Sequence, residues 1–187
     1  VVYRTQRLPE PKKFIEIWRQ LADKEGIGEL FFVGTAQNLK PIEWGFDGIV
    51  SNAPGVQVKN LSEKRKEGIL ERIFSSSRPK SKPKVYDYKK LVESYLNETL
   101  PDQEFPIIIP NWDNTPRSGV NGIVLENSDP DQFGEMLEKA IKQVENRDFE
   151  RKVIFIKSWN EWAEGNYLEP DRRFGRGYLE MVKQKIR

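Results

Sequence analysis

The sequence contains no histidine and no cysteine. These absences exclude disulfide bonds, thiolate nucleophiles, Cys/His zinc sites and Ser-His-Asp triads from this chain. Any chemistry within it must therefore use carboxylates, Lys, Arg, Tyr or backbone groups. A cysteine-free chain fits a reducing compartment, so we expect a cytoplasmic location, although an oxidising compartment fits almost as well.

Long apolar runs and an excess of one charge are also absent. No segment reaches the roughly 18 consecutive apolar residues of a membrane-spanning helix, so no membrane span is predicted. The first residues also lack the basic-then-apolar pattern of a secretory signal. The 31 Lys and Arg residues nearly balance the 29 Asp and Glu residues, which leaves a net charge of +2. This balance predicts no nucleic-acid or membrane partner held by bulk electrostatics.

Apolar runs alternate with amphipathic helical patterns along the chain. This alternation is typical of βαβ units, so we expect an α/β fold with a parallel sheet, and a single domain over residues 1–187. With 187 residues, the chain is shorter than a complete eight-stranded α/β barrel, which has about 250. The strands are predicted at residues 1–3, 30–33, 46–50, 105–109 and 153–156, with a further short extended piece at 123–125.

A helix is predicted over residues 11–24, with Phe14, Trp18, Leu21 and Ala22 on its apolar face. Residues 60–84 are predicted to form an exposed loop, because their basic, Ser- and Pro-rich composition cannot bury enough apolar area to offset the entropy of ordering. A phosphate-binding role for this stretch is the weaker alternative. The other predicted helices cover residues 88–96, a segment that begins at Asp129-Pro130 with a capping pattern, and residues 178–186.

Unusual polar and aromatic residues follow three of the predicted strands. In parallel α/β folds, ligands bind at the carboxyl ends of the strands, because the loops there converge on one face. We therefore expect these residues to share one pocket, although each cluster alone is better explained as strand-end residues that cap the next helix. The clusters are Tyr3-Arg4, Asn111-Trp112-Asp113-Asn114 and Ser158-Trp159-Asn160-Glu161.

Three of the five tryptophans, Trp112, Trp159 and Trp162, lie in or next to the two richest clusters. A flat aromatic ring stacks on the C–H face of a sugar, while Asp, Asn and Arg side chains bind its hydroxyl groups. The combination predicts a carbohydrate ligand. The alternative is that these tryptophans are core residues between the sheet and the helices.

Glu161 and Glu164 are the candidate catalytic residues. Chemistry at a glycosidic bond commonly uses two carboxyl groups near the anomeric carbon. On extended backbone their spacing would aim them at opposite faces, but a tight turn, which Gly165 permits, lets both face one pocket. Like-charge repulsion and nearby indole rings would favour the protonated form of one carboxyl, as a general acid requires. We expect both in one aromatic-lined cleft. If they point onto separate surfaces, or form ion pairs away from any concavity, the enzymatic interpretation fails.

Two of these segments resemble motifs of a known family. Residues 158–171, S-W-N-E-W-A-E-G-N-Y-L-E-P-D, resemble the last-strand motif of the WbsX-type glycosyltransferases and of the related glycoside hydrolase family 99-like barrels. Residues 112–117 resemble the W-D-N-T-P-R motif of the same family, and Gly45-Phe46-Asp47 resembles a third shared element. The resemblance covers essentially the whole chain, but only about the C-terminal half of the family's sequence.

The resemblance implies a parallel (β/α)8 TIM-barrel fold, of which this chain would supply roughly the last five strands, with the missing N-terminal half of the barrel as its partner. It also implies a glycosyltransferase or glycoside hydrolase that acts on a cell-surface polysaccharide or related glycan. In the hydrolase relatives, two glutamates of an E-W-H-E segment carry catalysis, the first assisting a sugar hydroxyl and the second acting as acid and base. Glu161 and Glu164 match them, whereas Ala163 replaces the histidine, which leaves hydrolysis itself open.

Two further interpretations stay open: a non-catalytic carbohydrate-binding or scaffold barrel, and a doubly wound nucleotide-binding domain. The latter would place a glycine-rich turn after its first strand, but neither a G-x-G-x-x-G nor a P-loop pattern occurs. We predict no metal and no cofactor. The residues predicted to contact a glycan substrate are Tyr3, Arg4, Trp112, Asp113, Asn114, Arg117, Trp159, Asn160, Trp162, Tyr167 and Glu169.

Overall fold

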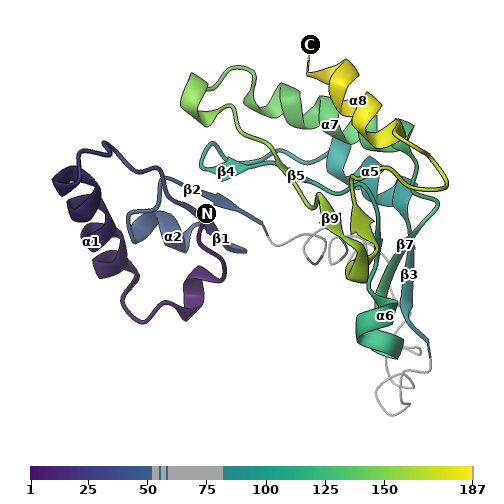
Figure 1. The fold of residues 1–187 in the computed structure, drawn as a ribbon, viewed down its shortest axis with the longest axis horizontal. Coiled ribbons are helices and arrows are strands. Elements are labelled where there is room, and N and C mark those ends of the chain that lie inside the picture. Colours follow the sequence, from purple (N-terminus) through teal and green to yellow (C-terminus); the bar gives the residue numbers. More distant parts are fainter. Residues whose placement is uncertain (52–54, 56–57, 59–81, 187) are drawn as a thin grey trace.

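The computed structural model describes residues 1–51, 55, 58 and 82–186. Within this part, short strands alternate with helices, and α5 (Tyr88–Leu96), α7 (Pro130–Val144) and α8 (Gly177–Lys185) pack together on one side of the sheet (Figure 1). In the described residues no helix has the length and apolar character needed to cross a membrane.

Strand segments of the main sheet run parallel to one another, in the order in which they occur along the chain. Each pairs with the next, whereas a doubly wound sheet reverses its strand order at a switch point. This order is the one found between consecutive strands of an α/β barrel. The segments are Val2, β1 (Val33–Thr35), β2 (Gly48–Val50), β4 (Glu104–Phe105) continued after Pro106 by β5 (Ile107–Ile108), and β8 (Phe155–Ile156).

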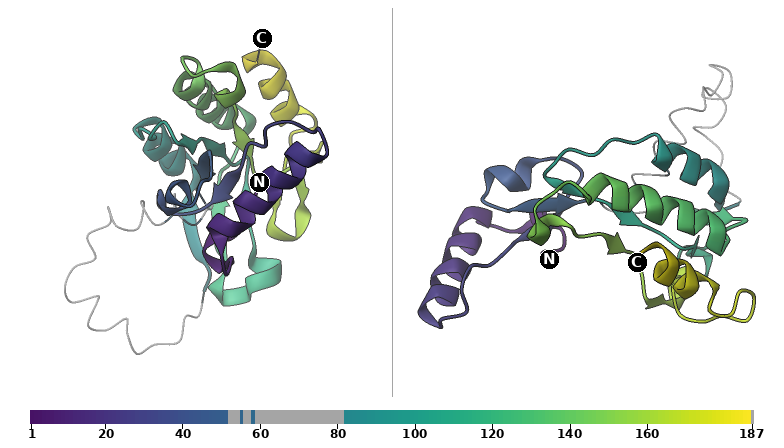
Figure 2. Two further views of the ribbon diagram at one scale, coloured as in Figure 1. Left: turned by 90° about the vertical axis from the view of Figure 1, so that its left-hand side faces the viewer. Right: turned by 90° about the horizontal axis from the view of Figure 1, so that it is seen from above.

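The sheet is open. Among the described residues, Val2 and β8 each pair with a neighbour on one side only. Figure 2 (right) shows the elements as a curved band that runs from α1 (Pro11–Lys24) to α8. The predicted α/β fold with parallel strands is confirmed, whereas closure into a barrel is not seen in this part of the chain.

The helices agree closely with the predictions, and the strands less so. α1 has the predicted bounds, and α7 begins as predicted, with the Asp129 carboxylate accepting a hydrogen bond from the Gln132 backbone N–H at 2.9 Å. The first predicted strand is reduced to a single bridge at Val2, and the second is shifted to Val33–Thr35.

Several short elements lie outside the main sheet. They are η1 (Thr5–Arg7), α2 (Lys40–Glu43), α6 (Thr115–Ser118), η2 (Gly119–Asn121), η3 (Phe149–Arg151), β9 (Asn160–Glu161), η4 (Trp162–Glu164) and β10 (Asn166–Tyr167).

A second, small sheet lies beside the main one, with the strand order β3-β7-β6. β3 (Lys84–Asp87) runs parallel to β7 (Ile123–Glu126), and β6 (Trp112–Asp113) runs antiparallel to it. The extended piece predicted at residues 123–125 is therefore β7. The loop predicted over residues 60–84 lies outside the described residues up to residue 81, and its last residue, Lys84, begins β3.

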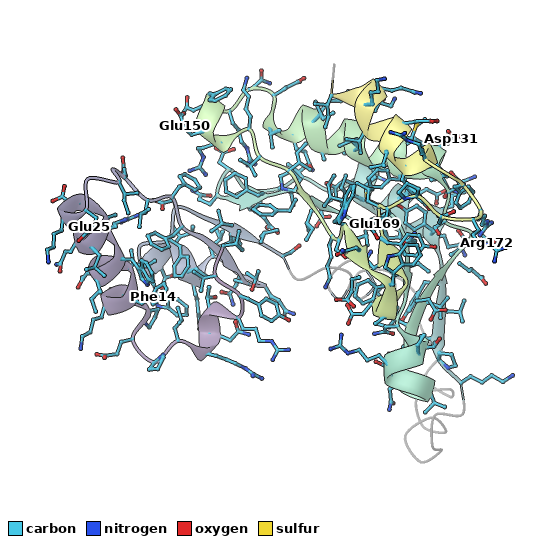
Figure 3. All side chains as sticks on the ribbon, viewed as in Figure 1. Phe14, Glu25, Asp131, Glu150, Glu169 and Arg172 are labelled. Atoms are coloured by element: carbon cyan, nitrogen blue, oxygen red, sulfur yellow. The ribbon has the colours of Figure 1, made fainter. Side chains whose placement is uncertain are left out.

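The main apolar core lies between the sheet and helices α5, α7 and α8, with Tyr88, Phe133 and Ile108 fully buried. The predicted apolar face of α1 is only partly covered. Ala22 is buried, and Phe14 packs edge-on against Phe32 with 6.3 Å between the ring centroids, but the side chains of Trp18 and Leu21 are exposed. Figure 3 shows Phe14 pointing from α1 toward the strands.

Candidate functional site

The segments that follow β5 and β8 form the candidate site. Because β5 and β8 are paired neighbours, these two segments leave the sheet at adjacent carboxyl ends. The first contains β6 and α6, and the second forms the β9–β10 hairpin with η4 at its turn. α6 and η4 are in contact, and they lie side by side in Figures 1 and 2.

A buried amide network joins the two segments. The Asn166 side chain is fully buried, and its Nδ2 donates to the backbone carbonyls of Asn111 at 2.6 Å and Lys157 at 2.9 Å. Its Oδ1 accepts from Ser158 Oγ at 2.9 Å. The backbone N–H of Tyr167 donates to Asn111 Oδ1 at 2.9 Å. Because satisfied buried polar groups specify one arrangement, this network fixes the hairpin against the end of β5.

Gly165 provides the predicted turn after the two glutamates. It has a φ of +51°, and a Cβ atom at this position would lie 2.9 Å from both the backbone N and the backbone O of Asp113. Asp113 in turn holds the start of α6, since its Oδ1 accepts from Thr115 N at 2.9 Å and from Thr115 Oγ1 at 2.6 Å. The neighbouring Asn114 accepts from Ile123 N at 2.7 Å. Asp113 and Asn114 therefore hold local structure, and their contact with a sugar stays a prediction.

The two candidate carboxylates have different surroundings. Glu164 accepts a hydrogen bond from Arg117 Nη1 at 3.0 Å, and the Glu164 side chain is 18% exposed while that of Arg117 is 63% exposed. Glu161 is half-buried on β9, where it pairs with Asn166 in the hairpin. Glu164 is thus held in an ion pair between the two segments. A shared cleft for both carboxylates stays a prediction.

The three tryptophans of the candidate site are one core residue and two exposed ones. Trp112 is 5% exposed, and Lys157 Nζ lies 4.8 Å from the centroid of its ring. Trp159 is 54% exposed and Trp162 is 48% exposed, so neither is a core residue. The Trp162 ring stacks on Tyr167 with 3.8 Å between the centroids.

Glu169 extends this aromatic surface with a polar contact. Its Oε2 accepts a hydrogen bond from Trp162 Nε1 at 2.7 Å, and Figure 3 shows Glu169 beside β9. Burial, together with the charge of Asp171, raises the pKa of the Tyr167 hydroxyl above its usual value. Asn160 is exposed at the start of the hairpin. Indole, phenol and carboxylate groups therefore meet at Trp162, two positions before Glu164, an arrangement suited to a sugar ring and its hydroxyls.

Tyr3 and Arg4 lie apart from this cluster, at the other edge of the sheet. They line a cavity of about 390 Å³ together with residues that follow β1. The cavity residues that follow β1 were not predicted from the sequence. The signal that identified the other clusters, polar residues after a predicted strand, applies to them as well. The cavity also includes Thr35, Gln37, Asn38, Lys40 and Trp44.

The Gly45-Phe46-Asp47 motif has a structural role in this chain. The Asp47 carboxylate accepts from Arg19 Nη2 at 2.9 and 3.0 Å and from the backbone N–H of Phe32 at 2.7 Å. It thereby ties α1 to the segment that leads into β1.

The described residues contain no group of three or more His, Cys, Asp or Glu side chains placed to hold a metal ion. The prediction of no metal overlooked Asp129-Pro130-Asp131, since two carboxylates at such a spacing can bind a divalent cation. Asp129, however, is engaged as the N-cap of α7, where it also accepts from the Gln132 side-chain amide.

The chain is similar to known proteins in sequence and in fold. An uncharacterized protein, WxcX, from two strains of Xanthomonas campestris pv. campestris is 30% identical over 190 residues, which span all of this chain but 26% of the relative. A solved structure, a glycoside hydrolase-like protein, matches 95% of this chain and 50% of its own length, with a TM-score of 0.58 and 16% identity, which shows a shared fold. The sequence profile described as "Glycosyltransferase WbsX" matches residues 1–182. The chain therefore belongs to the WbsX glycosyltransferase family.

Proposed function

We propose that this protein is a carbohydrate-active enzyme that forms or breaks glycosidic bonds in a cell-surface polysaccharide or related glycan. The observation that carries the proposal is the contact between Arg117 and Glu164, which lie 47 positions apart and are joined at 3.0 Å. It brings the two motif segments together, and the second of them carries the exposed Trp162. The family description names a glycosyltransferase, and the solved neighbour is glycoside hydrolase-like.

We further propose that the parallel strands are part of a (β/α)8 barrel. Their order along the sheet supports this, because consecutive barrel strands are neighbours in space. The unpaired edges at Val2 and β8 would then be covered by another segment of the protein. In such a barrel all carboxyl ends face one opening, where the catalytic groups of these enzymes gather.

Glu161 and Glu164 are the proposed working carboxylates. Glu161 would assist the sugar hydroxyl next to the anomeric carbon, and Glu164 would deliver a proton to the leaving oxygen and recover one from the incoming group. Arg117 positions the Glu164 carboxylate, and the exposed face of Trp162 would stack on a sugar ring. Both roles require only carboxyl groups, which the chain contains.

Replacing the carboxylates by amides tests the proposal. The full-length protein is incubated with candidate glycans, and cleavage, transfer and retention are measured together. Glu164→Gln should retain glycan binding but lose turnover by about 100- to 10,000-fold, the usual contribution of a general acid–base residue. Glu135→Gln, at an exposed position on α7, is the matched control and should behave as the unchanged protein.

The outcomes separate the candidate functions. Normal turnover in Glu164→Gln would remove Glu164 from the mechanism. Retention of glycans without any product from the unchanged protein would instead indicate a carbohydrate-binding module, a role that the Arg117–Glu164 ion pair would also permit.

A further inference from the structure

The cavity at Tyr3 and Arg4 lies at the edge of the main sheet opposite to the two glutamates. It is formed where Val2 and β1 end, whereas Glu161 and Glu164 follow β8. Its volume of about 390 Å³ is in the range of small-ligand pockets. The side chains that define its chemistry are Tyr3, Arg4, Gln37, Asn38, Lys40 and Trp44.

The charged groups of this cavity all have the same sign. Of the residues that the structure describes, the charged ones that line it are Arg4 and Lys40, and no described carboxylate contributes to the wall. Among residues 1–51 and 82–186, neither cation forms a salt bridge. Two cations without a counter-charge in a concave site attract an anionic group, and an arginine binds a carboxylate or phosphate through paired hydrogen bonds.

The backbone holds Arg4 in an unusual conformation. Its φ is +54°, which is rare for a residue with a side chain and persists only when the surroundings enforce it. The Arg4 N–H donates to Thr35 Oγ1 at 2.7 Å, and the hydroxyl of the buried Thr5 donates to the Thr35 carbonyl at 3.2 Å. Gly34 permits this approach, because a Cβ there would lie 2.7 Å from Thr5 Cγ2. The backbone of Arg4 is therefore fixed before a ligand binds, and its exposed side chain lies over the Tyr3 ring, with Cζ 5.1 Å from the ring centroid.

The rest of the lining suits a sugar ring. Trp44 and Tyr3 provide aromatic faces, and the amides of Gln37 and Asn38 can both donate to and accept from hydroxyl groups. We infer that this cavity binds a sugar that carries an anionic group, either a carboxylate or a phosphate, with the anion on Arg4 and Lys40. The inference rests on the proposed carbohydrate function and adds the charge of the substrate.

Calorimetric binding to the full-length protein tests this inference. The probes are glucuronic acid, glucose 1-phosphate, glucose and inorganic phosphate at matched pH and ionic strength. At least one anionic sugar should bind about tenfold more tightly, or better, than both glucose and inorganic phosphate. A hydrogen bond to a charged group typically contributes this much to affinity. The two anionic sugars separate a carboxylate ligand from a phosphate ligand. The affinity should fall as salt is added.

Two substitutions locate the site. Arg4→Gln and Lys40→Gln should each lower the affinity for the anionic sugar by about tenfold or more while leaving the affinity for glucose unchanged. Arg7→Gln is the matched control, since Arg7 lies in the same short helix as Thr5 but does not line the cavity. Thermal unfolding of each variant confirms that the fold is retained, and Lys40→Gln provides an independent test if Arg4→Gln alters the fold.

The inference is overturned if glucose or inorganic phosphate binds as tightly as both anionic sugars, or if Arg7→Gln weakens binding as much as Arg4→Gln. Its failure is distinct from failure of the proposed function. If Glu164→Gln abolishes turnover of a neutral glycan while no preference for an anionic sugar exists, the cavity inference is wrong and the proposed function stands. If anionic sugars bind at Arg4 but Glu164→Gln leaves turnover unchanged, the cavity inference stands and the proposed function is wrong.

Discussion

Gly165 sets the distance between the two segments of the candidate site. An alanine there would carry two separate costs. The left-handed backbone costs about 1 kcal/mol for a residue with a Cβ, and the Cβ would also meet the Asp113 backbone at 2.9 Å. Gly175 separates these costs, because it has a similar φ of +57° but nothing within 4 Å of the Cβ position.

Gly165→Ala should therefore lower the free energy of unfolding by more than Gly175→Ala, which should lose only about 1 kcal/mol. Urea unfolding of the two variants and the unchanged protein measures this difference. Gly165→Ala should also reduce turnover, because the preceding residue is Glu164. Equal destabilisation by the two substitutions would contradict the close contact with Asp113.

Glu104 begins β4 and is the clearest source of a pH effect at the level of elements. Its partial burial raises the pKa of the Glu104 carboxyl above the ordinary value of 4.5, and the nearby Glu98 raises it further. Because the folded pKa is higher than the unfolded one, the folded state binds the proton more tightly. The resulting stabilisation is fully present below pH 4.5 and is lost as the pH rises through the folded pKa.

Glu104→Gln should consequently unfold at a higher temperature than the unchanged protein at pH 7, with the difference shrinking as the pH falls through the folded pKa toward 4.5. Thermal unfolding followed by circular dichroism across this pH range measures the effect. Glu135→Gln, on an exposed position of α7, should show no such change. A Glu104→Gln variant that is less stable at pH 7 would show that the carboxylate makes a favourable contact instead.

Helices were more predictable than strands for a physical reason. α1 and α7 carry apolar periodicity over 14 and 15 residues, and Asp129 marks the start of α7 by a local hydrogen bond. The described strands have two to four residues, so their limits depend on pairing with distant segments. Phe31 and Phe32 continue the apolar run before β1, yet pairing begins at Val33. No local pattern distinguishes these positions.

The sequence predicted three strand-end clusters in one pocket, and the structure brings two of them together. The strand-end clusters at Asn111 and Ser158 come together because β5 and β8 are neighbours. The cluster at Tyr3 lies apart from them because Val2 is at the opposite edge of the sheet. The hydrogen bonds that occupy Asp113 are local contacts with Thr115, of the helix-capping kind expected for strand-end residues. The burial of Trp112 depends instead on tertiary packing, which residue spacing does not encode.

At the scale of the whole molecule, the open sheet carries the two distinct places where we propose that a ligand binds. The glutamate cluster lies beyond β8, and the cationic cavity lies beyond Val2 and β1. If the sheet continues into a closed barrel, both would border one opening, because all parallel strands of a barrel direct their carboxyl ends to the same face. A long glycan would then reach both, with its anionic residue held at Arg4 while the bond that reacts lies at Glu161 and Glu164.

A crystal structure of the full-length protein with a bound glycan tests the central claim most directly. The account predicts a sugar ring against Trp162, with Glu164 within about 3.2 Å of the glycosidic oxygen and Glu161 within hydrogen-bond reach of the neighbouring hydroxyl. A glycan bound elsewhere, with Glu164 still paired only to Arg117 and Glu161 directed away from the sugar, would contradict it.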